Sequence, residues 1–193
     1  SLAAMKDPVF AQIVGQSSAV IPVAGTVHNV NGLLVRDNIV GVKTGNTDEA
    51  GGCFVAAANH VVDGKTITVV TAIMAAPNLT RSMLDSVPLL ASAKANFTSA
   101  TVLPKDTTVG TYSPVWSGQR MALKTAQDIR LILWKGSQLK LNVGIDTATA
   151  PLGARTNVGT VYISAAGTNA KTAVVTSEPL TEPSLFWRLR HPL

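Results

Sequence analysis

The chain has 193 residues, of which 46% are hydrophobic, 14% are charged and 5% are aromatic. This length suits one or two domains of about 100 residues each, and the abundance of Val, Ala and Thr favours β-strands and excludes a disordered chain. The formal charge of +5 comes from scattered Lys and Arg residues, which indicates a mildly basic surface and not a nucleic-acid interface.

Cysteine and histidine offer little for chemistry. Cys53 is the only cysteine, so the chain has neither an internal disulfide nor a thiolate metal cluster. Because Cys53 precedes Phe54 in a run of small residues, a buried and inert thiol is favoured over a Cys53/His60 catalytic pair. The remaining histidines, His28 and His191, are too dispersed for a metal site. We expect no metal and no cofactor. No apolar stretch is long enough to cross a membrane, and the N-terminal residues lack the pattern of a signal peptide.

Residues 1–96 mix helix and strand signals. In chain order we expect a short helix after Asp7-Pro8, a turn leading into a strand from residues 29–34, a strand over 39–45, two strands over 54–60 and 65–74 joined around Asp63-Gly64, and a helix capped by Asn78. Pro88 is expected to kink or split that helix near Ser86.

Residues 97–193 show short alternating runs broken by Gly, Pro and Asp, a pattern typical of an all-β unit. We place the domain boundary within residues 96–101 and find no internal repeat. The expected strands cover residues 107–116, 121–125, 129–134, 139–143, 158–164 and 172–176.

The most specific motif is Gly41-Val-Lys-Thr-Gly-Asn-Thr-Asp-Glu-Ala-Gly51, which contains Lys-Thr-Gly and is followed by an apolar strand of small residues. It resembles the Lys-Thr-Gly region of D-alanyl-D-alanine carboxypeptidases, the low-molecular-mass penicillin-binding proteins of serine peptidase type. The resemblance extends upstream to residues 29–34, downstream to residues 71–74, and into the second half. It implies an α+β penicillin-binding/β-lactamase-like catalytic domain, present here in part as residues 1–96, followed by an all-β sandwich over residues 97–193.

The resemblance also implies site residues. Lys43 would hold the substrate carboxylate and favour deprotonated catalytic groups, and Thr44 would donate its hydroxyl to that carboxylate. Gly45 would leave room for a substrate that adds to the strand edge, and the Asn46 backbone N–H would belong to an oxyanion hole. Thr47 and Arg81 are further substrate-binding candidates, although a solvated helix arginine is an equal alternative for Arg81.

The catalytic serine of this family is not found in the chain. The family order is Ser-x-x-Lys, Ser-x-Asn and then Lys-Thr-Gly, and neither earlier motif precedes Lys43. One Ser-x-x-Lys, Ser137 to Lys140, follows it in an expected strand, so it is interpreted as accidental. We therefore expect the chain to lack the nucleophile and to be inactive alone. The first half is expected to expose apolar surface or to pair with another copy.

Expected partners follow from the family: peptidoglycan stem peptides ending in D-Ala-D-Ala, and β-lactams, both through the full-length enzyme of the cell envelope, and no nucleic acid. The C-terminal run around Phe186-Trp187-Arg188 suggests either a membrane surface or a last strand. Three alternatives stay open: a piece of a longer enzyme, a non-catalytic cell-wall binding or scaffold module, and a β-lactamase. The β-rich second half disfavours the β-lactamase.

Overall fold

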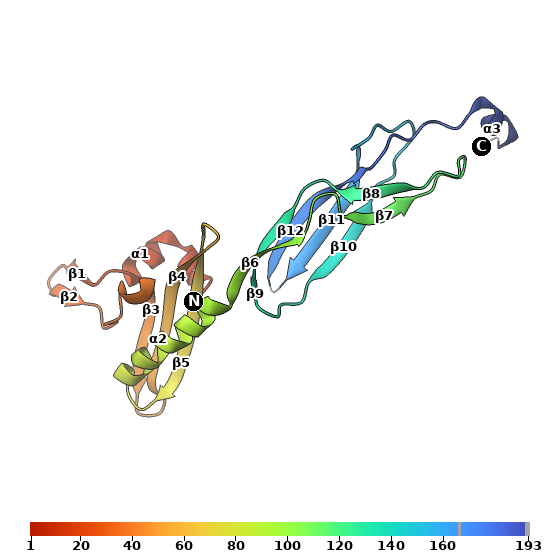
Figure 1. Cartoon of the computed structure of the whole chain (residues 1–193). Coiled ribbons are helices and arrows are strands. Elements are labelled where there is room, and N and C mark those ends of the chain that lie inside the picture. The colour runs from red at the N-terminus through yellow and green to blue at the C-terminus, as the bar shows by residue number, and fades with distance from the viewer. Residues whose placement is uncertain (166, 192–193) are drawn as a thin grey trace. The chain divides into compact units, whose positions relative to one another are not determined.

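The computed structural model describes residues 1–165 and 167–191, which form two compact units, Ser1–Thr98 and Ser99–Leu193 (Figure 1). Most of the secondary structure is antiparallel β-sheet. The break between the units falls within the range of residues where the sequence changes from mixed signals to alternating runs.

Unit 1 is built on one antiparallel sheet of three strands in the order β3-β4-β5. These strands are β3 (Ile39–Thr47), β4 (Gly51–Val62) and β5 (Lys65–Ala76). Helix α2 (Leu79–Asn96) lies across one face of the sheet, against β4 and β5 (Figure 1). The apolar side chains between helix and sheet form the core of this unit. Its buried members are Leu33, Ile39, Phe54, Ala56, Ala58, Val69 and Leu90.

Helix α2 begins where the sequence predicts, because the Asn78 side chain accepts a hydrogen bond from the Arg81 N–H at 2.8 Å. It continues as one helix through Pro88, so the predicted split near Ser86 is wrong. Ser86 is fully buried and donates its hydroxyl to the Met83 carbonyl at 2.7 Å. Packing of the apolar face against the sheet keeps the helix continuous in spite of the N–H that proline lacks.

Short elements precede the sheet. They are η1 (Ala4–Lys6), α1 (Pro8–Val14), the hairpin strands β1 (Ser18–Ile21) and β2 (Gly25–His28), and η2 (Arg36–Asn38). Helix α1 starts at the predicted Asp7-Pro8 cap. The hairpin was not predicted, because its strands are short and mostly exposed and therefore show no apolar alternation. Asn29 secures its end by donating its side-chain amide to the carbonyls of Val14 and Gln16.

Unit 2 contains a five-stranded antiparallel sheet in the order β10-β11-β12-β8-β7 and a two-stranded sheet of β6 and β9. The buried core of this unit includes Leu103 and Ile129 from β6 and β9, together with Leu123, Val161 and Val174 from the larger sheet. The strands are β6 (Phe97–Leu103), β7 (Thr108–Tyr112), β8 (Met121–Thr125), β9 (Ile129–Trp134), β10 (Lys140–Ile145), β11 (Asn157–Ala165) and β12 (Thr168–Thr176). The sequence predicts an all-β second half. It places the domain boundary at residues 96–101, where the structure has β6, and predicts a longer strand, over residues 107–116, where the structure has β7.

The chain ends in a short helix, α3 (Leu185–Arg190), and not in the last strand that was the alternative prediction for this region. The Trp187 ring stacks on His191 at 4.3 Å between centroids and meets Trp116 edge-on at 6.2 Å. Phe186 is instead 63% exposed, with the Arg190 guanidinium 4.1 Å from its ring centre. The last two residues of the predicted aromatic and basic run, Pro192 and Leu193, lie outside the described residues.

Unit 2 contains an internal repeat, which corrects the prediction that there is none. The segments 103–111 and 152–160 share Leu, Thr, Val, Gly and Thr at equivalent positions. Their pairing registers agree: β7 pairs with β8 as β11 pairs with β12, and both ladders contain a bulge just before the shared glycine, Gly110 or Gly159. At the centre of the sheet, β8 pairs with β12. Lys124 of β8 stands opposite Val175 of β12, and these two residues hold equivalent positions in the repeat. The two halves are therefore related by an approximate two-fold axis through this pair.

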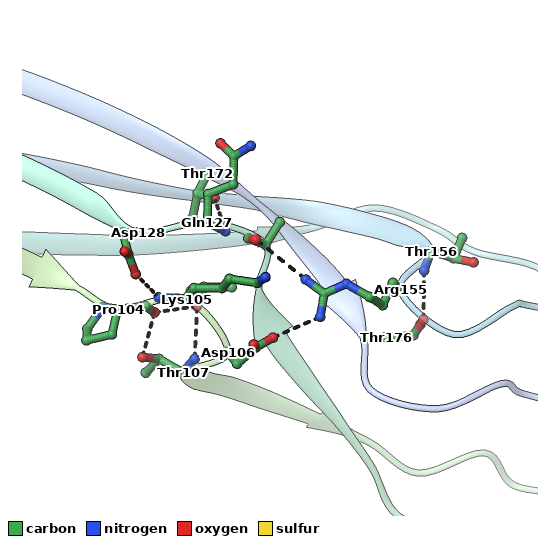
Figure 2. A network of polar contacts seen from close by, with 12 residues as sticks. Pro104, Lys105, Asp106, Thr107, Gln127, Asp128, Arg155, Thr156, Thr172 and Thr176 are labelled. Carbon is green, nitrogen blue, oxygen red and sulfur yellow. Dashed lines mark hydrogen bonds and ion pairs between the residues drawn. The ribbon is translucent and has the colours of Figure 1, made fainter.

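The same hydrogen bonds hold the turn that precedes each repeated strand. Buried Thr125 accepts the Thr107 N–H at 2.9 Å and donates to the Pro104 carbonyl at 2.7 Å. Buried Thr176 accepts the Thr156 N–H at 2.9 Å, visible in Figure 2, and donates to the Gly153 carbonyl at 2.8 Å.

Arg155 and Asp106, which are equivalent residues of the two turns, form an ion pair at 2.9 Å (Figure 2). The hydrogen bond from Arg155 lowers the pKa of Asp106 below its ordinary value, and the charges of Arg155, Lys105 and Lys124 act in the same direction. The pair joins the two halves across the surface of unit 2.

Candidate functional site

The Lys-Thr-Gly motif lies on β3, the edge strand of the unit 1 sheet. Lys43, Thr44, Gly45 and Asn46 follow each other along this strand and pair with residues 52–55 of β4. The opposite edge of β3 has no neighbouring strand among the described residues. Lys43 and Asn46 are exposed, and the Lys43 ammonium donates a hydrogen bond to the Thr44 carbonyl. The motif is thus displayed on a strand that can accept an extended peptide on its free side.

Gly45 has no structural reason to be glycine within unit 1. A Cβ added at this position would meet only the Cys53 Cβ, at 3.8 Å, which is an ordinary van der Waals distance. Its φ is outside the left-handed region. The lack of a side chain at Gly45 therefore leaves space on the strand surface without being needed to pack the unit itself.

Gly51 and Gly52, at the other end of the motif, are required by the fold. Gly51 has φ of +62°, and a Cβ there would lie 2.6 Å from the Ala76 carbonyl oxygen. A Cβ on Gly52 would lie 2.1 Å from the Asn78 carbonyl, because the start of α2 crosses directly over β4. Since Gly52 pairs with Asn46, this contact fixes the first turn of α2 beside the motif strand. In the sequence, the Gly51-Gly52 pair signals a close approach of another backbone segment. The site residues were predicted without it.

The two substrate-binding candidates outside Lys43–Asn46 have local partners. The Thr47 hydroxyl accepts the Ala50 N–H at 3.0 Å and so closes the turn between β3 and β4. Arg81, in the first turn of α2, forms a two-pronged ion pair with Asp85 at 3.0 Å and 2.8 Å. Its side chain is 59% exposed. Arg81 lies on the element that packs beside the motif, but its guanidinium is held by Asp85.

Among the other reactive groups, Cys53 lies beside the motif, opposite Gly45 in the sheet, and Ser137 belongs to unit 2. Ser137 follows a turn after β9 and donates its N–H to the Trp134 carbonyl at 3.0 Å, so its hydroxyl is not at a helix N-terminus. Cys53 is half-buried and its thiol contacts the Ala50 carbonyl at 3.4 Å, whereas Phe54 is fully buried. His60 pairs with Ile67 in the sheet. In the part of the chain that the structure describes, no cluster of three or more His, Cys, Asp or Glu side chains could hold a metal ion.

One comparison, with protein families, concerns the second unit. Residues 97–182 match the family model described as the C-terminal domain of penicillin-binding protein 5. This match confirms the resemblance of the chain to the C-terminal portion of D-alanyl-D-alanine carboxypeptidases that the sequence predicts. The matched region is the non-catalytic part of that family, and a complete α+β catalytic domain is not present among the described residues. No curated protein sequence matches the chain.

The solved structures that are similar to the chain include three whose matches cover most of it. Penicillin-binding protein 5 from Haemophilus influenzae has 22% identity over 89% of this chain and 51% of its own, with a TM-score of 0.47. The D-alanyl-D-alanine carboxypeptidase DacD from Francisella tularensis has 24% identity over 81% of this chain and 40% of its own, with a TM-score of 0.43. A peptidoglycan synthesis regulatory factor, PBP3 from Streptococcus pneumoniae, has 20% identity over 92% of this chain and 53% of its own, with a TM-score of 0.52.

Of these three structures, the one from Streptococcus pneumoniae has a TM-score above 0.5, and it bears on the fold alone. The third supports a shared fold that extends through both units. The chain spans about half the length of these structures or less.

Proposed function

We propose that the chain supplies the Lys-Thr-Gly substrate-binding strand of a serine D-Ala-D-Ala carboxypeptidase that trims peptidoglycan stem peptides through an acyl-enzyme. Unit 1 is then the C-terminal part of its catalytic domain, and unit 2 is its C-terminal β domain. The observation that carries the proposal is the position of Lys43, Thr44, Gly45 and Asn46 on an edge strand of a chain whose second unit matches the C-terminal domain of penicillin-binding protein 5.

The chemistry assigns a role to each motif residue. Lys43 supplies a fixed positive charge and Thr44 a hydroxyl for the substrate carboxylate. The substrate backbone adds to the β3 edge beside Gly45, and the Asn46 N–H donates to the oxyanion. Thr47 holds the turn that follows, and Arg81 contributes charge only if its pair with Asp85 opens.

The nucleophilic serine would come from residues outside this sequence. The sheet face turned away from α2 exposes a single apolar side chain near each of its two ends, Val61 at 63% and Met74 at 75%. Between them Ala57 is fully buried. We propose that a serine-bearing segment would contact the exposed parts of this face; self-association in its absence is measured by sedimentation at increasing concentration.

The first test uses the purified 193-residue chain. It is expected neither to release D-alanine from a D-Ala-D-Ala peptide nor to form a covalent adduct with fluorescent penicillin, because Lys43 and its neighbours bind but provide no nucleophile. Release of D-alanine, or a penicillin adduct in the intact mass spectrum, would contradict the proposal.

The second test separates binding residues from structural ones in a parent protein that carries the upstream serine region. Lys43→Ala is expected to slow acylation by penicillin about 100-fold. Gly45→Ala is expected to slow acylation while leaving the thermal unfolding of unit 1 within the experimental error, because its Cβ would meet no close neighbour in the chain. Equal acylation rates in both variants and the wild type would show that β3 is not the substrate strand.

The envelope location and the membrane contact are part of the same proposal. None of the helices in residues 1–165 and 167–191 is long and apolar enough to cross a membrane. Helix α3 exposes Leu185, Phe186 and Leu189, at 77%, 63% and 80%, next to Arg188 and Arg190. Such a surface suits the interface of an anionic membrane. Flotation of the chain with anionic lipid vesicles, and its absence with neutral vesicles, tests this contact.

A non-catalytic cell-wall or scaffold module is the second candidate, favoured by the position of the family match entirely within the β domain. Binding of the chain to purified peptidoglycan, together with the absence of a Ser-x-x-Lys sequence upstream in its gene, would support this candidate against the enzyme.

A further inference from the structure

The two halves of the large sheet in unit 2 differ at their outer edges. On one side, β10 pairs with β11 along its whole length, from Lys140 opposite Ser164 to Ile145 opposite Gly159. On the other side, β7 occupies the place equivalent to β11 and is the terminal strand of the sheet among the described residues. The repeat therefore provides a strand for one outer edge and leaves the equivalent edge of β7 without one.

The direction of the peptide groups on β7 can be inferred from β11, which is the equivalent strand in the repeat. The Val158 carbonyl accepts the Asp146 N–H at 2.9 Å on the β10 side of β11. Since successive peptide groups of a strand alternate in direction, the Thr160 N–H also faces β10. Thr111 holds the equivalent place on β7, with the same bulge and the same pairing to the inner strand. Its N–H therefore faces away from β8, toward the open edge.

The side chains of β7 do not block this edge. The strand reads Thr-Val-Gly-Thr-Tyr and contains neither a charged residue nor proline, the usual devices that protect an edge. Thr108, Thr111 and Tyr112 are exposed. Tyr112 also lines an apolar cavity together with Met121 and Leu123. A residue placed opposite Tyr112 would share the face of the sheet on which this cavity lies.

We propose that the edge of β7 binds an extended segment of a partner polypeptide as an added antiparallel strand, in the register that β10 adopts on β11. The residue types expected in the partner segment can be inferred from β10. Val143 stands opposite Val161, the equivalent of Tyr112, and Gly144 stands opposite Thr160, the equivalent of Thr111. The partner segment accordingly has a β-branched apolar residue opposite Tyr112 and a small residue next to it, opposite Thr111. This inference does not depend on the proposed enzymatic function.

The test uses a synthetic peptide of residues 138–146, which contains β10, added to the full 193-residue chain. Two-dimensional NMR is expected to show saturable shifts at Gly110, Thr111 and Tyr112. Thr111→Pro is expected to weaken binding at least tenfold, because it removes the outward N–H while costing no ladder hydrogen bond. Thr111→Lys should weaken binding as well, since an edge lysine disfavours strand addition. Thr111→Val, which keeps the N–H, should bind as the wild type does.

Four outcomes would overturn the inference. Shifts confined to β11 would mean that the peptide displaces β10 instead of pairing with β7. Equal binding by Thr111→Pro and Thr111→Val would exclude pairing through the β7 backbone. Concentration-dependent dimerisation of the chain that Thr111→Lys abolishes would make a second copy, and not a partner segment, the occupant. Unfolding of unit 2 by Thr111→Pro alone would show that the Thr111 N–H is used inside the sheet.

Discussion

Thr125→Val and Thr176→Val are each expected to lower the free energy of unfolding of unit 2 by about 2–4 kcal/mol. Valine has nearly the shape of threonine, so packing is preserved and the hydroxyl alone is lost. Each of these fully buried hydroxyls accepts one backbone N–H and donates to one carbonyl. The substitution leaves both backbone groups with one hydrogen bond fewer in a place that water does not reach freely. Because the repeat makes the two sites equivalent, the two losses should be similar.

Urea unfolding followed by tryptophan fluorescence measures this loss, because Trp116, Trp134 and Trp187 all belong to unit 2. Thr125→Ser and Thr176→Ser keep the hydroxyl and remove one methyl, so they should cost about 1 kcal/mol. The exposed Thr111→Val provides a surface control with no expected change. A valine variant as stable as its serine counterpart would mean that the hydrogen bonds of the hydroxyl make no net contribution to the free energy of unfolding. A large difference between the two valine variants would contradict the equivalence of the two halves.

The sequence predicted what depends on local signals. The capped starts of α1 and α2, the strands around the Lys-Thr-Gly motif and the all-β second half were found because Asp7-Pro8, Asn78 and the apolar alternations act within a few residues. Helix α2 was predicted to kink or split near Ser86 because of Pro88, since its burial against the sheet, which keeps it continuous, is a tertiary effect. The hairpin β1-β2 was missed because its exposed strands have no apolar pattern.

The internal repeat was missed for a different reason. Only Leu, Thr, Val, Gly and Thr coincide between its two segments, and so short a match of common residue types is not distinctive in a sequence. What makes the segments equivalent is the pairing register, the matching bulges and the two buried threonines, which lie in other strands. Similarly, the role of Gly52 depends on the chain returning over β4 at Asn78. The Gly-Gly pair signals a close approach but does not reveal which segment makes it. The roles of Lys43, Thr44, Gly45 and Asn46 remain predictions that the tests above address.

The second large effect is expected for Gly52→Ala, which should lower the free energy of unfolding of unit 1 by about 3 kcal/mol. The new methyl carbon would lie 2.1 Å from both the carbon and the oxygen of the Asn78 carbonyl, and 2.6 Å from the Leu79 nitrogen. These are backbone atoms at the start of α2, which cannot turn aside as a flexible side chain would. The helix must therefore shift as a body, and its contacts with Phe54, Val69 and the rest of the core loosen with it.

Cys53 provides the measurement, because it is the only thiol in the chain, is half-buried and follows Gly52 directly. Its reaction with a thiol reagent in increasing urea should reach the unfolded rate at lower urea in Gly52→Ala, while the tryptophan transition of unit 2 stays unchanged. Gly45→Ala is the matched control on the neighbouring strand, since its Cβ would meet only the Cys53 Cβ, at 3.8 Å. Because Gly52 pairs with Asn46, the same shift of α2 would disturb the end of the motif strand. If both alanine variants behaved alike, the close approach of α2 to β4 would not be what makes glycine necessary at Gly52.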